Sequence, residues 1–93
     1  MTFEVIWTEE AEDRLAEVWM AAPDRGAVTR AAHEIDVALE MLPMSAGKPL
    51  FDTVRQFGDS VLTVEFEVDQ NERRVYVMNV WSTAEGKPDV KGN

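Results

Sequence analysis

The sequence predicts an α+β protein in which a two-helix hairpin packs on one face of a small, mostly antiparallel sheet. Residues 61–68 alternate between apolar and polar side chains, which is the period of a half-buried strand. A second apolar run covers residues 74–81, and the polar residues 69–72 join the two runs as a hairpin. By contrast, residues 9–22 and 25–42 carry apolar side chains at helical spacing.

The first element along the chain is a short strand over residues 3–7, which we expect to join the same sheet. Thr8 then offers an N-cap for the first helix, and Pro23 ends it because the residue before a proline avoids helical geometry. Asp24 caps the second helix, which Pro43 ends. Two amphipathic helices with so short a link should form an antiparallel pair on the sheet.

After the helices, residues 43–53 read as a loop and residues 54–57 as a short strand. The last strand has apolar residues on both faces, with Val75 and Val77 opposite Tyr76, Met78 and Val80, which predicts an interior position in the sheet. Residues 1–81 are expected to form one domain, and residues 82–93 a flexible C-terminal tail. The expected core consists of Leu15, Val18, Trp19, Ile35, Leu39, Leu62, Val64, Phe66, Val75 and Val77.

Composition limits the possible classes of protein. A chain of 93 residues corresponds to one domain, and its lack of cysteine excludes disulfides and thiolate zinc sites. Neither a membrane span nor a signal peptide is recognisable in the sequence. These features fit a cytoplasmic protein, with no cofactor expected.

The charge is strongly acidic. The 18 acids against 9 bases give −9, and residues 1–47 alone hold ten acids and three bases, or −7. Since an acidic body repels phosphate at long range, direct nucleic-acid binding is not expected. The only histidine, His33, falls on the outer face of the second helix near Asp36 and Glu40, and a single imidazole without a defined ligand set does not predict a metal site.

The opening run Val5–Ala11 is followed by Leu15, Leu42-Pro43 is followed by Gly47, and Val54-Arg55 begins the next strand. The runs 64–68 and 74–81 come after them. Taken in this order, strand, helix, helix, three strands, these segments resemble the RelE/ParE superfamily of toxins from bacterial type II toxin–antitoxin (plasmid stabilisation) systems, and the resemblance covers residues 3–81.

The resemblance implies either ribosome-dependent cleavage of messenger RNA or poisoning of DNA gyrase, with neutralisation by a cognate antitoxin. The RNA-cleaving branch carries basic residues on the open sheet face and after the last strand. This chain has Thr63 and Thr83 at those positions, and the open face adds Glu65 and Glu67. Cleavage through the 2′-hydroxyl requires cations and a proton shuttle, so a ribonuclease activity is not expected.

Three functions remain open. The first is a toxin-like protein that acts through protein contacts, and the second is a non-toxic family member that serves as a binding module or homodimer. The third is an endoribonuclease that uses Arg55, the best match to a family arginine, together with Lys48. Residues expected to contact a partner are Trp81, Arg55, Arg74, Val37 and Met41. Trp81 has a second interpretation, in which it closes the sheet end against Trp7 or Trp19.

Overall fold

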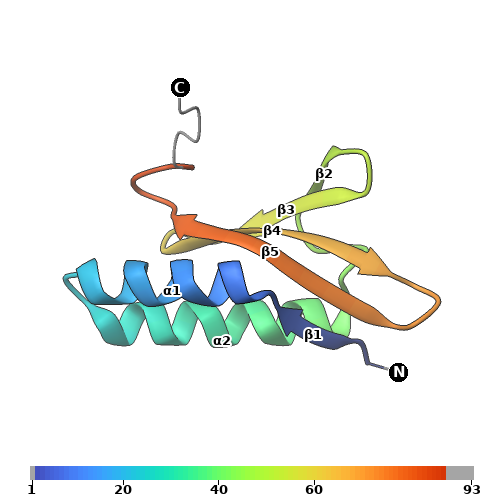
Figure 1. Ribbon diagram of the computed structural model, residues 1–93, viewed down its shortest axis with the longest axis horizontal. Coiled ribbons are helices and arrows are strands. Elements are labelled where there is room, and N and C mark those ends of the chain that lie inside the picture. Colours follow the sequence, from blue (N-terminus) through green and yellow to red (C-terminus); the bar gives the residue numbers. More distant parts are fainter. Residues whose placement is uncertain (1, 88–93) are drawn as a thin grey trace.

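The computed structural model describes residues 2–87 and has two layers, a helical hairpin and a sheet (Figure 1). β1 (Glu4–Trp7) leads into α1 (Glu9–Ala21) and α2 (Arg25–Met41), which are followed by β2 (Lys48–Phe51), β3 (Val54–Gly58), β4 (Leu62–Asp69) and β5 (Arg74–Ser82). This is the predicted α+β class. Residues 88–93 of the predicted tail lie outside the described residues, whereas Ser82 belongs to β5.

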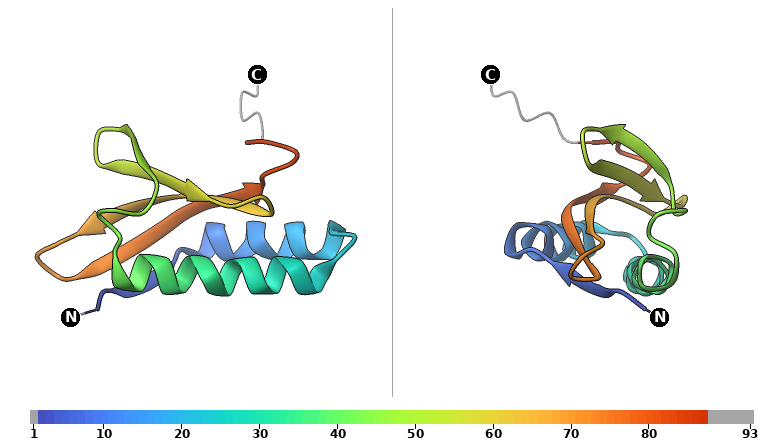
Figure 2. Two further views of the ribbon diagram at one scale, coloured as in Figure 1. Left: turned by 180° about the vertical axis from the view of Figure 1, so that it is seen from behind. Right: turned by 90° about the vertical axis from the view of Figure 1, so that its right-hand side faces the viewer.

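Both helices begin where the sequence predicted. The Thr8 hydroxyl accepts a hydrogen bond from the Ala11 amide at 3.2 Å, and the Asp24 carboxylate accepts one from the Ala27 amide at 3.1 Å. Each cap satisfies an amide that the first turn of a helix leaves without a partner. The two helices lie side by side along the same face of the sheet, as the end-on view in Figure 2 shows.

The sheet is mixed, with strand order β1-β5-β4-β3-β2. β1 runs parallel to β5, and the other three pairs are antiparallel. Placing β5 between β1 and β4 confirms the interior position that its apolar residues predicted. β2 is an additional strand, because the sequence predicted a loop over residues 43–53.

A bulge in β5 decides which side chains of that strand face the helices. Glu65 pairs with Asn79 and Phe66 pairs with Val77, so Met78 is an extra residue in the ladder. The prediction that Val80 shares a face with Tyr76 and Met78 is therefore wrong. The bulge reverses the alternation, and Val80 joins Val77 in the core with no exposed surface.

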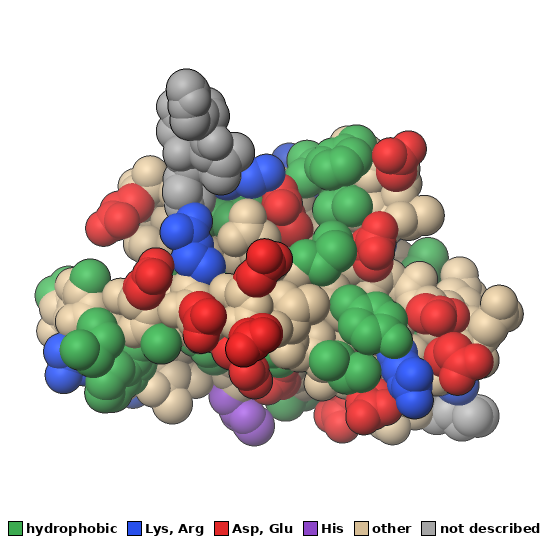
Figure 3. Space-filling view, in the orientation of Figure 1, with side chains coloured by type: hydrophobic (Ala, Val, Ile, Leu, Met, Phe, Trp, Pro, Cys, Tyr) green, Lys and Arg blue, Asp and Glu red, His purple; other side chains and the backbone are tan. Residues whose placement is uncertain are grey.

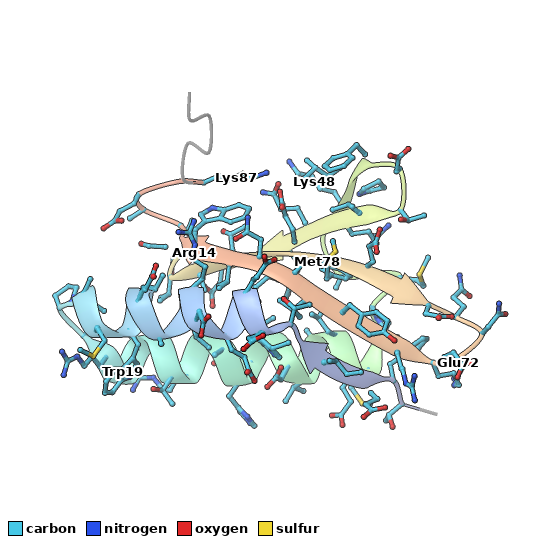
Figure 4. All side chains as sticks on the ribbon, in the orientation of Figure 1. Arg14, Trp19, Lys48, Glu72, Met78 and Lys87 are labelled. Carbon is cyan, nitrogen blue, oxygen red and sulfur yellow. The ribbon has the colours of Figure 1, made fainter. Side chains whose placement is uncertain are left out.

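The core lies between the helices and the sheet. It holds the predicted residues Ile35, Leu39, Leu62, Val64, Phe66, Val75 and Val77, with Leu15 and Val18 packed against it. Trp19 was predicted wrongly, because 38% of its surface is exposed. It lies at the far end of the helical pair (Figure 4), where its indole N–H donates to the Thr29 hydroxyl at 3.2 Å and the Arg25 guanidinium lies 4.6 Å from the ring centroid.

Candidate functional site

The candidate site is the sheet face opposite the helices, hereafter the open face, which carries Thr63, Glu65 and Trp81. Alternation along β4 places Thr63 and Glu65 away from Leu62, Val64 and Phe66, as predicted. Trp81 pairs with Thr63 across the ladder and shares its face. It is 6% exposed, although it is not part of the core cluster beneath the helices.

This position excludes the expected contact of Trp81 with Trp7. Trp7 pairs with Val77, on the helix-facing side of the sheet. Its indole N–H donates to the Asp36 carboxylate at 2.6 Å, which ties β1 to α2. Trp81 is buried on the other face, so these two tryptophans belong to separate packing layers.

The C-terminal turn, residues 83–87, covers part of the open face. The Thr83 amide donates to the Val61 carbonyl at 3.0 Å, and the amides of Glu85 and Gly86 donate to the Ser82 carbonyl at 3.1 and 3.0 Å. The Thr63 and Thr83 hydroxyls are 2.7 Å apart and share a hydrogen bond. The two positions where the resemblance implies basic residues are thus occupied by hydroxyls that bond to each other.

The turn also brings a cation to the open face. The Lys87 ammonium lies 2.8 Å from the Glu65 carboxylate and 5.8 Å from the centroid of the Trp81 ring. The side chain of Glu65 is 9% exposed and that of Lys87 is 46% exposed. Sequence reasoning missed Lys87 because it follows the last periodic residue of the chain, and no local pattern relates it to Glu65.

Lys48 reaches the same face from the edge strand. It pairs with Gln56, which in turn pairs with Glu65, and it lines a shallow cleft of about 510 Å³ together with Thr63 and Thr83. Figure 4 shows Lys48 and Lys87 on the side of the sheet away from the helices. This edge of the open face therefore carries two ammonium groups, one of them paired with a carboxylate.

Arg55 is on the opposite side of the sheet from Lys48. It pairs with the core residue Phe66, and its guanidinium donates to the Ala46 carbonyl at 3.2 Å. The buried Nε of Arg55 has no hydrogen-bond partner among the described residues. The structure therefore does not bring together the two residues considered for a ribonuclease site.

The other candidate contact residues are also separated. Arg74 lies at the start of β5, 3.3 Å from the Glu4 carboxylate, and interactions with Tyr76 and then with Glu4 raise its pKa. Val37 and Met41 are 44% and 55% exposed on α2. His33 is exposed on that helix as well. Within residues 2–87, no three potential ligands are grouped so as to hold a metal ion.

The helical layer, on the other side of the molecule from the open face, is acidic. Carboxylates gather over α1, where Glu9, Glu10 and Glu12 occupy the first turn (Figure 3). Carboxylates in the first turn of a helix are stabilised by the positive end of the helix dipole. They also add negative potential to one side of the molecule. No helix within the described residues is long and apolar enough to cross a membrane.

Solved structures of other proteins share this architecture. A chain of the toxin–antitoxin complex RelBE2 from Mycobacterium tuberculosis has a TM-score of 0.74 at 15% identity, with 88% of this chain and 92% of that chain covered. A chain of the chromosomal ParDE toxin–antitoxin system of P. aeruginosa has a TM-score of 0.68 at 14% identity, with 86% and 95% covered. The conserved hypothetical protein HP0892 from Helicobacter pylori has a TM-score of 0.59 at 11% identity, with 89% and 97% covered.

The protein therefore has the RelE/ParE-like toxin fold. No protein-family model matches the chain, and no curated protein sequence matches it. The likeness is one of architecture, because identities of 11–15% do not transfer individual residues.

Proposed function

We propose that this protein is the toxin-like component of a bacterial type II toxin–antitoxin pair, and that it acts in the cytoplasm through protein contacts rather than by cleaving RNA. The fold supports the first part, since two of the structural relatives come from toxin–antitoxin systems. A cognate antitoxin would then be its first partner.

The chemistry of the open face carries the second part. An RNA-cleaving site needs cations that stay available to the scissile phosphate and a group that moves a proton. Here Thr63 and Thr83 bond to each other, and Lys87 is paired with Glu65 at 2.8 Å. If a phosphate drew Lys87 away, Glu65 would be left unpaired, and two like unit charges about 4 Å apart repel by about 4 kcal/mol at intermediate dielectric.

The ribonuclease alternative receives no support from the positions of Arg55 and Lys48, since their side chains leave the β2–β3 pair on opposite faces. Of the two activities implied by the resemblance, poisoning of DNA gyrase is the one that does not involve cleavage of RNA. We therefore place gyrase ahead of the ribosome as the target.

The test is regulated expression in a bacterium, with soluble protein confirmed by blotting. Growth arrest without new 5′ ends in translated messages, together with a change in plasmid supercoiling, is the expected result. Normal growth at high soluble expression would refute toxicity. If expression of the wild type produced new cuts at A-site codons, and expression of Lys48→Gln did not, the protein-contact mechanism would be refuted.

A non-toxic binding module is the second candidate, and exposed apolar residues on and after α2 favour it. Val37, Met41, Leu42 and Met44 are 44%, 55%, 65% and 47% exposed. Such residues suit a protein contact or a homodimer. Sedimentation velocity of the wild type and of Met41→Lys would identify a homodimer, because a charge in an apolar contact should dissociate it. A neighbouring reading frame of antitoxin type would favour the toxin-like function over this one.

A further inference from the structure

Glu65 is a carboxylate held in an interior position of the sheet. β4 lies between β3 and β5, and the side chain of Glu65 is 9% exposed. Its neighbours across the two ladders are Gln56 and Asn79, which carry neutral amides. Taking a carboxylate out of water is costly unless a cation or several donors compensate it. This location therefore calls for a positive partner.

Lys87 supplies that partner, but from a tethered turn. Its side chain is 46% exposed, and the ammonium contacts Glu65 at one side and lies 5.8 Å from the Trp81 ring centroid. A carboxylate beside the face of an indole is a combination that binds cations, since the ring face is negative. Because Lys87 is half exposed, another cation can reach the carboxylate, and exchanging one cation for another leaves Glu65 paired.

We propose that Glu65 and Trp81 form a receptor for a cationic side chain, which Lys87 occupies within the chain and which an arginine or lysine of a protein partner occupies in a complex. The proposal rests on the proposed protein-contact function and names the chemistry of the contact. The net charge of −9 would attract a basic partner. Arginine fits best, because its planar guanidinium can bind the carboxylate with two donors and stack on the indole.

The experiment uses the full chain labelled with ¹⁵N and follows the indole N–H signal of Trp81, assigned by comparison with Trp81→Phe. The probe is N-acetylarginine amide, and the neutral control is N-acetylcitrulline amide. A short tether gives Lys87 an effective concentration in the millimolar range. Lys87→Gln should therefore bind the arginine probe about tenfold more tightly than the wild type.

Glu65→Gln in the Lys87→Gln background should abolish the saturable shift. The matched control is Glu67→Gln, which changes the next carboxylate of the same face, bonded to Thr53 at 2.6 Å, and should leave the affinity unchanged. Circular dichroism of each variant shows that it is folded. Equal shifts with citrulline, or equal losses in Glu65→Gln and Glu67→Gln, would overturn the proposal. A dimer that Glu65→Gln dissociates would also overturn it, because a second copy would then be the occupant.

The outcome is independent of the toxicity test. Saturable arginine binding without growth arrest would keep the cation receptor and refute the toxin-like function. Growth arrest without arginine binding would keep the toxin-like function and refute the cation receptor.

Discussion

Replacing Trp81 by alanine should destabilise this protein more than replacing Trp19, although the helical pattern assigns Trp19 to the core. Trp81 is 6% exposed and Trp19 is 38% exposed. A tryptophan that buries about 200 Å² at about 25 cal/mol/Å² contributes about 5 kcal/mol when fully buried. The difference in exposure therefore corresponds to about 1.5 kcal/mol in the free energy of unfolding.

The assay is urea denaturation followed by far-ultraviolet circular dichroism, which does not depend on the indole that has been removed. Trp81→Ala should cost about 4 kcal/mol, which lies within the range of large-to-small core substitutions. Trp19→Ala should cost about 2.5 kcal/mol. In a thermal scan by the same circular dichroism signal, the melting temperatures of the two variants should differ by about 6–12 °C for a domain of this size. If Trp19→Ala cost as much as Trp81→Ala, the burial of Trp81 beneath the C-terminal turn would be refuted.

The remaining predictions concern the sheet and its contacts. Val80→Ala should lower the free energy of unfolding by about 2 kcal/mol and Met78→Ala by under about 1 kcal/mol, since only Val80 is fully buried, and equal losses would refute the bulge. Gly47→Ala should cost over about 2 kcal/mol in the same assay, because Gly47 has φ +63° and an added Cβ would overlap the Gln56 carbonyl; a neutral substitution would exclude this close approach. Asp36→Ala should cost about 1–3 kcal/mol by leaving the part-buried Trp7 indole N–H without its acceptor, whereas Glu40→Ala, at an exposed site on the same helix, should change stability by under about 0.5 kcal/mol.

Local signals were enough to predict the helices. The caps at Thr8 and Asp24 and the breaks at Pro23 and Pro43 act within a few residues, so the sequence displays them directly. The alternation of β4 was equally readable, because one face of this strand is apolar and the other polar.

The errors arose where a distant partner decides the structure. β2 contains Pro49 and has an exposed side chain at every position. No apolar pattern therefore marks it as a strand, and it is recognised by its pairing with β3. The extra residue Met78 becomes visible only when β5 is aligned with β4. Trp19 follows the apolar period of its helix, but it lies at the far end of the helical pair (Figure 4), where 38% of its surface stays exposed.

The candidate site was predictable in part for the same reason. Thr63 and Thr83 were recognised as departures from the resemblance, and the structure brings them into contact. Their hydrogen bond and the pairing of Glu65 with Lys87 depend on how the C-terminal turn folds back, and no pattern along the chain describes that.

The parallel pairing of β1 with β5 has a consequence for how the chain folds during synthesis. Glu4 aligns with Arg74, and the two side chains that join these strands are 70 residues apart in sequence. At about 5–20 residues per second, β1 is made several seconds before β5, the strand with which it pairs. During that interval its amides and carbonyls lack the sheet ladder, and closure of so long a loop makes this pairing one of the slower contacts to form. The N-terminal strand is therefore the segment most open to other partners until translation has passed β5.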